Sequence, residues 1–286
     1  RIKLGVFRSA PPQPPLHAVA LERNDVADAV DDVLNAVQML QEISSASGAG
    51  ISRAIVAGSV PELQNHLASR WKAALCPLFQ IQSACDVGIP LDVDSPERVG
   101  VDRALNALAA AAMTGTAPAI LCVSGTAITV DLVTSDQVFR GGCILPGMRL
   151  SAKALHEHTA LLPLLSFPED DETRTVTAVQ DSALREACQP AWLTGLPDVP
   201  GRNTEAAMTA GLVLGQLGAV RELTVRLADA ARDRYHEQQM PRLLFSGGSG
   251  RLLAAHLANA EYVEDLTLQG LALWGYQHRD SQTTRR

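Results

Sequence analysis

Short apolar runs alternate with helical hydrophobic patterns along most of the chain. Two runs, at residues 2–7 and 17–22, predict a β-hairpin near the start. Residues 26–43 place apolar side chains every three or four positions, which predicts an amphipathic helix. Further strands are predicted near residues 54–60 and 78–82, with a helix between them. The first part of the chain therefore mixes strands and helices.

A second series of elements begins near Pro118. The pattern predicts three strands, a helix, a long helix and a closing strand–helix–strand–helix tail. These elements fall at residues 119–123, 127–133, 137–144, 147–162 and 203–236, with the tail at 242–275. Both halves place strands first and helices afterwards, which suits a duplicated α/β fold.

Composition narrows the class of protein. Hydrophobic residues make up 47% of the 286 positions and charged residues 19%, enough for a sizeable core. The net charge of −7 argues against a nucleic-acid partner, and no apolar run reaches the roughly 20 residues of a membrane span. The odd number of cysteines and the lack of a CxxC pair favour neither disulfides nor zinc, so a cytoplasmic location is expected. The cysteines are Cys76, Cys85, Cys122, Cys143 and Cys188.

The segment from Pro96 to Arg103 carries the strongest chemical signal. It places an acid and a base together after Gly100, where an alanine-rich helix is predicted at residues 104–113. Asp102 can accept a proton, and Arg103 can bind an oxyanion through two hydrogen bonds. Gly100 lets a ligand approach the backbone. The segment reads either as a capped helix start or as the substrate half of a phosphoryl-transfer site.

Three glycine-rich turns follow at predicted strand ends. Gly125 and Thr126 lie in a hairpin whose amides and hydroxyls can cradle phosphate, although an ordinary turn is the alternative. Residues 141–147 join a double glycine to a Pro-Gly helix entry, which indicates a bulge and helix start or a close approach to substrate. Gly247 and Gly248 lie between a strand and a helix, which suits a nucleotide or a plain tight turn. The spacing excludes a P-loop.

A fourth polar position begins the long helix. Asn203 is a good N-cap, and the hydroxyl and free amides near Thr204 suit an anionic ligand, with capping alone as the alternative. His156 and His158 fall on different helix faces, so no metal site is predicted. No nucleophile elbow is present, so hydrolase chemistry is not indicated.

Taken in order, the motifs PxxVGxDR, GTAxTxD, GGxIxPG, GxNTxxAM and SGG resemble those of the type III pantothenate kinases. These belong to the actin, hexokinase and sugar-kinase superfamily. The resemblance implies two ribonuclease-H-like (actin-like ATPase) domains, with mixed five-stranded sheets flanked by helices and a cleft between them. The domains would cover residues 1–115 and 116–286, the last helix being free to pack back on the first domain. It also implies ATP with Mg²⁺, and a homodimer.

The same resemblance assigns roles to named residues. Asp102 would be the general base for the phosphorylation of pantothenate to 4'-phosphopantothenate, the first step of coenzyme A biosynthesis. The residues that would bind substrate are Gly100, Val101, Arg103 and, from the neighbouring subunit, Thr204. The residues that would bind ATP are Gly125, Thr126, Gly247 and Gly248.

Three features depart from the family pattern. Family members carry an Asp-x-Gly-Asn-Thr motif just before a first strand like this one, and this sequence starts where that motif ends, so we expect the chain as it stands to bind ATP poorly. Val123 replaces an Asp linked to a monovalent cation, K⁺ or NH₄⁺, and Val93 replaces a common Tyr of the substrate pocket. Two alternatives therefore stay open: a catalytically impaired homologue acting as a dimeric binding or regulatory protein, and a kinase for another small hydroxy compound.

Overall fold

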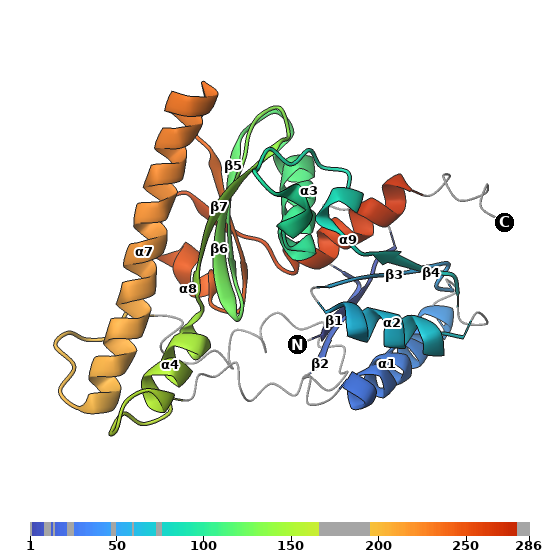
Figure 1. Ribbon diagram of the computed structural model, residues 1–286, viewed down its shortest axis with the longest axis horizontal. Coiled ribbons are helices and arrows are strands. Elements are labelled where there is room, and N and C mark those ends of the chain that lie inside the picture. Colours follow the sequence, from blue (N-terminus) through green and yellow to red (C-terminus); the bar gives the residue numbers. More distant parts are fainter. Residues whose placement is uncertain are drawn as a thin grey trace. The chain divides into compact units, whose positions relative to one another are not determined.

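A computed structural model describes residues 2–8, 13, 15–21, 26–46, 50–58, 60–72, 76–165 and 195–278. These residues form two compact units (Figure 1). Unit 1 holds the described residues up to Met113 and from Asp265 onward, and unit 2 holds those from Thr114 to Glu264. Cys188 lies outside the described residues. The predicted α/β class is confirmed.

Unit 1 contains two small sheets and most of the short helices. Its elements are β1 (Ile2–Val6), β2 (His17–Leu21), α1 (Val26–Ala46), β3 (Ala54–Ala57), α2 (Pro61–Arg70), β4 (Leu78–Ile81), η1 (Ala84–Asp86), η2 (Pro96–Arg98), α3 (Val101–Thr114) and α9 (Leu266–Gln277). The antiparallel β1–β2 pair confirms the predicted hairpin, and β3 pairs with β4 in parallel. Val30 and Val33 of α1 and Leu67 of α2 are buried against these strands.

Unit 2 is built around one mixed sheet. Its elements are β5 (Ala119–Ser124), β6 (Ala127–Val133), β7 (Phe139–Pro146), α4 (Met148–Glu157), α7 (Thr204–Tyr235), β8 (Arg242–Gly247), α8 (Gly250–Ala255) and β9 (Ala260–Tyr262). The strand order is β7-β6-β5-β8-β9, with antiparallel pairs up to β5 and parallel pairs beyond it. The five-stranded mixed sheet implied by the resemblance is thus present in unit 2, whereas the described strands of unit 1 pair two by two.

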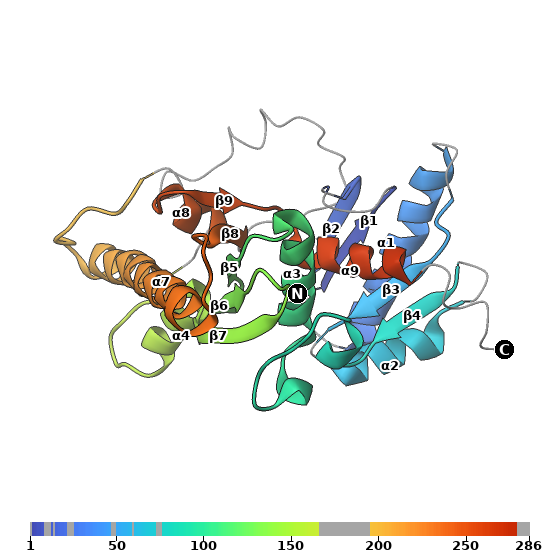
Figure 2. The same ribbon diagram turned by 90° about the horizontal axis from the view of Figure 1, so that it is seen from above.

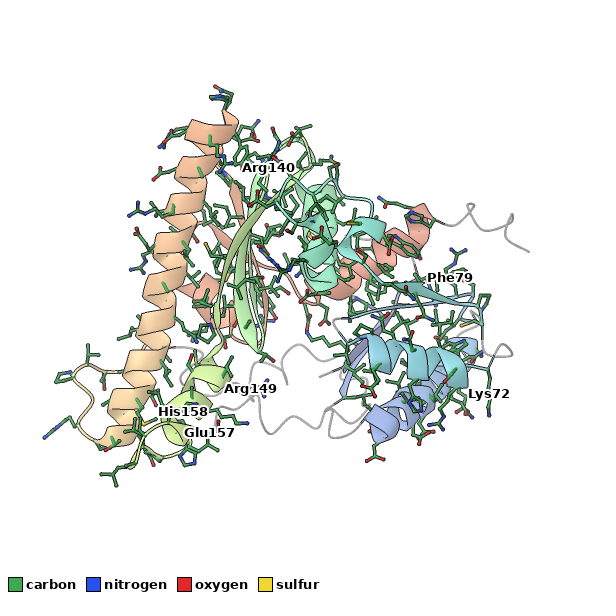
Figure 3. The ribbon with its side chains drawn as sticks, in the orientation of Figure 1. Lys72, Phe79, Arg140, Arg149, Glu157 and His158 are labelled. Carbon is green, nitrogen blue, oxygen red and sulfur yellow. The ribbon has the colours of Figure 1, made fainter. Side chains whose placement is uncertain are left out.

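The long helix α7 covers one face of this sheet, as Figure 2 shows from above. Ile128 and Val130 of β6 and Phe245 of β8 bury their side chains on that face, together with Leu217 and Val220 of α7. At the far end of α7, the Arg140 guanidinium lies 4.7 Å from the centre of the Tyr235 ring (Figure 3). These contacts fix α7 along its length.

Several element ends differ from the predicted ones for local reasons. The helix α3 begins at Val101 rather than at residue 104, because the amides of Arg103 and Ala104 both donate to the Gly100 carbonyl. The helix α2 ends at Arg70, since Trp71 has an extended backbone. The helix predicted at 147–162 is shorter in the structure, where α4 ends at Glu157. No helix in the described part of the chain is both long enough and apolar enough to span a membrane.

Candidate functional site

The glycine-rich turns of unit 2 meet at one edge of its sheet. Ser124 ends β5 and pairs with Gly247, which ends β8. On the other side of β5, Ala127 begins β6 and pairs with Pro146, the last residue of β7. The turns that follow these strand ends therefore lie together, although the chain separates them widely.

Glycine is required where these turns touch. A Cβ on Gly147 would lie 2.2 Å from the Gly125 carbonyl oxygen, and one on Gly247 would lie 2.0 Å from that of Ser124. Gly247 also has a φ of 85°, a left-handed conformation that favours glycine. The Gly147 amide donates to the Thr126 carbonyl at 2.9 Å. We call Gly125, Gly147 and Gly247 the glycine hub.

The turns that contain the glycine hub expose backbone groups and one hydroxyl-bearing residue to solvent. Gly125, Thr126 and Gly248 are exposed. The Gly125 amide donates to the Ala127 carbonyl at 2.9 Å, so this N–H closes the turn. Thr126 and the backbone at Gly248 are therefore the better placed groups for a phosphate or a nucleotide.

The double glycine of β7, Gly141 and Gly142, allows the neighbouring strand β6 to pack closely against β7. A Cβ on Gly142 would lie 2.1 Å from the Val130 carbonyl oxygen and 2.4 Å from Asp131 Oδ1. Gly141 has a φ of 84°, and the β6–β7 register shifts between Asp131 and Val133. The bulge that was one interpretation of this motif is therefore confirmed.

A buried carboxylate lies within β6, opposite Gly142 of β7 and Leu121 of β5. Asp131 is only 1% exposed. Burial first, and then the Asp131 charge, raise the pKa of the Cys122 thiol to about 12. Cys122 therefore stays protonated at neutral pH and is a structural residue rather than a nucleophile.

In unit 1 the predicted acid and base lie in the first turn of α3. Asp102 is exposed, and its Oδ1 accepts the Arg103 backbone N–H at 3.0 Å. A Cβ on Gly100 would lie 2.5 Å from that same Oδ1, so glycine at this position leaves room for the carboxylate. Val101 is only 6% exposed, so its side chain belongs to the core.

This arrangement leaves one oxygen of the Asp102 carboxylate available to a ligand. One oxygen is engaged by the helix itself, as the capping interpretation expects. The second oxygen of an exposed carboxylate can accept a hydrogen bond from a substrate hydroxyl.

The start of α7 confirms the predicted cap. Asn203 accepts the Ala206 N–H through its side chain at 2.8 Å. A Cβ on Gly201 would lie 2.3 Å from the Ala207 nitrogen, so glycine lets the preceding loop lie against the first turn. Because Asn203 supplies the cap, the exposed Thr204 is not needed for it.

Two residues that no sequence motif identified donate hydrogen bonds to main-chain carbonyls at or beside the glycine hub. Gln216 of α7 is 6% exposed, and its Nε2 donates to the Pro146 carbonyl at 3.2 Å. The Tyr262 hydroxyl donates to the Gly247 carbonyl at 3.4 Å. Each lies inside an ordinary helix or strand pattern, so no motif marked it.

Metal-binding groups are not gathered in the described part of the chain. No set of three or more His, Cys, Asp or Glu side chains there is placed to hold a metal ion. His156 Nδ1 lies 2.8 Å from the Leu162 carbonyl oxygen, which ties it to the loop after α4. His158 and Glu157 lie at the end of that helix, and Arg149 lies near its start (Figure 3).

Comparison with known proteins gives a consistent result. A family model for type III pantothenate kinases matches residues 1–226. The chain belongs to the type III pantothenate kinase family. The motif resemblance is thereby confirmed.

Individual relatives match different shares of their own length. A type III pantothenate kinase of Rhodopirellula baltica is 36% identical over 189 residues, which are 66% of this chain and 58% of that protein. One of Desulfosudis oleivorans is 32% identical over 234 residues, 81% of this chain and 79% of the relative. One of Agathobacter rectalis is 29% identical over 259 residues, 90% and 80% respectively. The chain thus spans less than two thirds of the Rhodopirellula relative.

The family match covers most of the predicted site. The α3 motif with Asp102, the turn with Thr126, and Thr204 all fall within residues 1–226. Gly247 and Gly248 fall beyond the matched residues, so their assignment depends on motif order and on the geometry of the hub.

Proposed function

We propose that this chain catalyses transfer of the terminal phosphoryl group of ATP to pantothenate, forming 4'-phosphopantothenate in the first step of coenzyme A biosynthesis. The observation that carries this proposal is the exposed Asp102 carboxylate in the first turn of α3, cleared by Gly100, in a chain of this family. Phosphoryl transfer depends mainly on positioning and charge stabilisation, so one well-placed carboxylate is a sufficient acid–base group.

In this mechanism Asp102 acts on the acceptor hydroxyl. Its Oδ1 is engaged by the Arg103 amide, so Oδ2 orients the hydroxyl and takes its proton late in the transfer. The Arg103 guanidinium pairs with the pantothenate carboxylate, and Gly100 and Val101 contact the substrate through their backbone.

The exposed surface of the hub fits a nucleotide. Thr126 binds its phosphates beside Gly125, whose own amide closes the turn, and Gly247 and Gly248 lie against adenosine, where a strand ends just before α8. ATP, bound with Mg²⁺, supplies the phosphoryl group. The described residues form no carboxylate cage, which fits Mg²⁺ held mainly by phosphate oxygens.

The monovalent cation expected from the family is a separate question. Val123 is half-buried in β5 and offers no oxygen from its side chain. Cations of this kind need oxygen ligands, so we propose that turnover by this chain depends little on K⁺ or NH₄⁺. A Val123→Asp variant tests this point by gaining a response to potassium.

We also propose a homodimer formed through α7. Gly211, Gly215 and Gly218 are exposed, and apart from the backbone of α7 itself no atom of the described residues comes within 4 Å of the Cβ that each could carry. With Thr204 they share one face of the helix, at spacings of seven, four and three residues. A second copy packed there would bring Thr204 to its neighbour's substrate.

Val93 and Val123 support the second candidate, an impaired homologue that binds without turnover, and Val93 also permits another hydroxy substrate. Two measurements separate these possibilities. Full-length protein is incubated with ATP and either pantothenate or related hydroxy acids, and the product is identified by mass spectrometry. Phosphopantothenate as the main product supports the proposal. Calorimetry that detects no ternary complex with ATP and pantothenate supports the silent homologue.

The cellular compartment is part of the same proposal. Cys76, Cys85, Cys122 and Cys143 are free thiols in the structure. Free thiols suit a reducing compartment, and a cytoplasmic location agrees with a step of coenzyme A biosynthesis.

A further inference from the structure

Two helices that are far apart in the sequence meet in unit 1. The Thr267 hydroxyl of α9 donates to Asn106 Oδ1 of α3 at 2.7 Å. Asn106 is 2% exposed and Thr267 is half-buried, so this hydrogen bond is largely shielded from solvent. Asn106 follows Asp102 by four residues, which places it one turn along the same face of α3. The bond therefore acts on the turn next to the proposed base.

A second contact brings the backbones of the same two helices together. A Cβ on Gly270 of α9 would lie 2.0 Å from the Leu105 carbonyl oxygen of α3 and 2.7 Å from its carbonyl carbon. Only glycine permits this approach. The close contact sets the distance between the helices, and the hydrogen bond at the neighbouring residue sets the rotation of α3 about its axis.

The helix α9 is itself held by the rest of unit 1. Trp274 Nε1 donates to the Asp86 carbonyl at 2.9 Å, and Arg53 Nη1 donates to the Gly275 carbonyl at 3.1 Å. At the other end, Lys3 Nζ lies 3.2 Å from Asp265 Oδ1. With anchors at both ends, α9 is a fixed support against which α3 is oriented.

We propose that Asn106 and Thr267 are positioning residues that aim the Asp102 carboxylate. Asp102 is exposed, and its Oδ1 bonds to the Arg103 amide of the same helix, so its direction follows the orientation of α3. The inference rests on the proposed function, because it concerns the base named there. It adds a requirement that the C-terminal helix be in place for the acceptor hydroxyl to be aligned.

The test uses three variants of the full-length chain. Thr267→Val removes the donor at nearly constant volume, and Thr267→Ser retains it. Thr224→Val is the matched control, because Thr224 is 8% exposed in unit 2 and its hydroxyl donates to the Val220 carbonyl at 2.8 Å. Amide hydrogen exchange is followed at Arg103 and Ala104, with kcat and the KM for ATP measured alongside.

We expect Thr267→Val to speed exchange at Arg103 and Ala104 by about tenfold, because the first turn of α3 loses its support. The kcat should fall by about 10- to 100-fold, the range that a small misplacement of a reacting group causes. The KM for ATP should not change. Thr267→Ser should stay within about twofold of the wild type in both readouts, and Thr224→Val should leave both unchanged.

Unchanged exchange at Arg103 in Thr267→Val would overturn the inference. So would faster exchange with an unaltered kcat, or a loss of kcat that Thr224→Val shares. If the wild-type chain does not phosphorylate pantothenate, the proposed function fails, and exchange at Arg103 alone then decides whether Thr267 orients α3.

Discussion

Gly100 leaves open the space that the Asp102 carboxylate occupies. A Cβ there would lie 2.5 Å from Oδ1, and the carboxylate, as the end of a side chain, can rotate away. We expect Gly100→Ala to lower kcat by about tenfold or more. The free energy of unfolding should change by less than about 1 kcal/mol. Steady-state kinetics and urea denaturation measure the two effects.

Gly50→Ala provides the control for that substitution. Gly50 is exposed in unit 1, and apart from its chain neighbours no atom of the described residues lies within 4 Å of its potential Cβ. It should keep the wild-type kcat. An equal kcat in Gly100→Ala would mean that the direction of Asp102 does not depend on the space beside it.

Cys122 gives unit 2 a defined response to alkaline pH. Its folded pKa of about 12 lies above the ordinary thiol value of 9.0, so the unfolded thiol ionises first as pH rises. The stability that the protonated thiol contributes is complete below pH 9 and is lost between pH 9 and 12. Between pH 8 and 10 the wild type should lose about 1 kcal/mol more than Cys122→Ala. Urea denaturation at both pH values measures this loss, and parallel losses would contradict the shift.

At the scale of elements, the glycine hub depends on β8 lying directly beside β5. We expect Gly247→Ala to cost about 2 kcal/mol more than Gly88→Ala, because both have left-handed φ values but only Gly247 is crowded, with Ser124 O 2.0 Å from its potential Cβ. Urea denaturation gives the two costs. Gly247→Ala should also weaken ATP binding measured by calorimetry. Equal stability losses would show that the crowding is relieved freely.

The strands that end at this hub could be predicted from their apolar residues. The contact between the turns that follow those strands could not be predicted. The turn at Gly125 and the entry at Gly147 were visible as motifs. Their contact depends on which strands are neighbours, and strand order does not follow from local patterns. The start of α3 was missed for a similar reason, because the alanine run marks the helix while the Gly100 carbonyl begins it.

The candidate site was predictable as a list of residues rather than as an arrangement. Asp102 and Thr204 were picked out by motifs with recognisable neighbours, and their roles stay predictions. The backing residues Gln216 and Tyr262 act through single contacts with main-chain carbonyls. Contacts of that kind require the folded chain, so residue type alone does not reveal them.

At the scale of the whole molecule, the homodimer that we propose forms through the face of α7 that carries Gly211, Gly215 and Gly218. Gly215→Arg places a long charged side chain on that face and should shift sedimentation from dimer to monomer. Ala255→Arg, an exposed change at the end of α8, should leave the dimer intact. Loss of turnover together with the dimer would support the role of Thr204. A wild-type protein that sediments as a monomer would contradict the proposed assembly.

The most direct test of the account is the turnover of Asp102→Asn. Glu62→Gln is the matched control, because Glu62 also lies in the first turn of a unit 1 helix. Each variant should lose less than about 1 kcal/mol of stability. Formation of 4'-phosphopantothenate should fall by about 10²- to 10⁴-fold in Asp102→Asn and stay at the wild-type rate in Glu62→Gln. A folded Asp102→Asn protein that phosphorylates pantothenate at the wild-type rate would contradict the central claim.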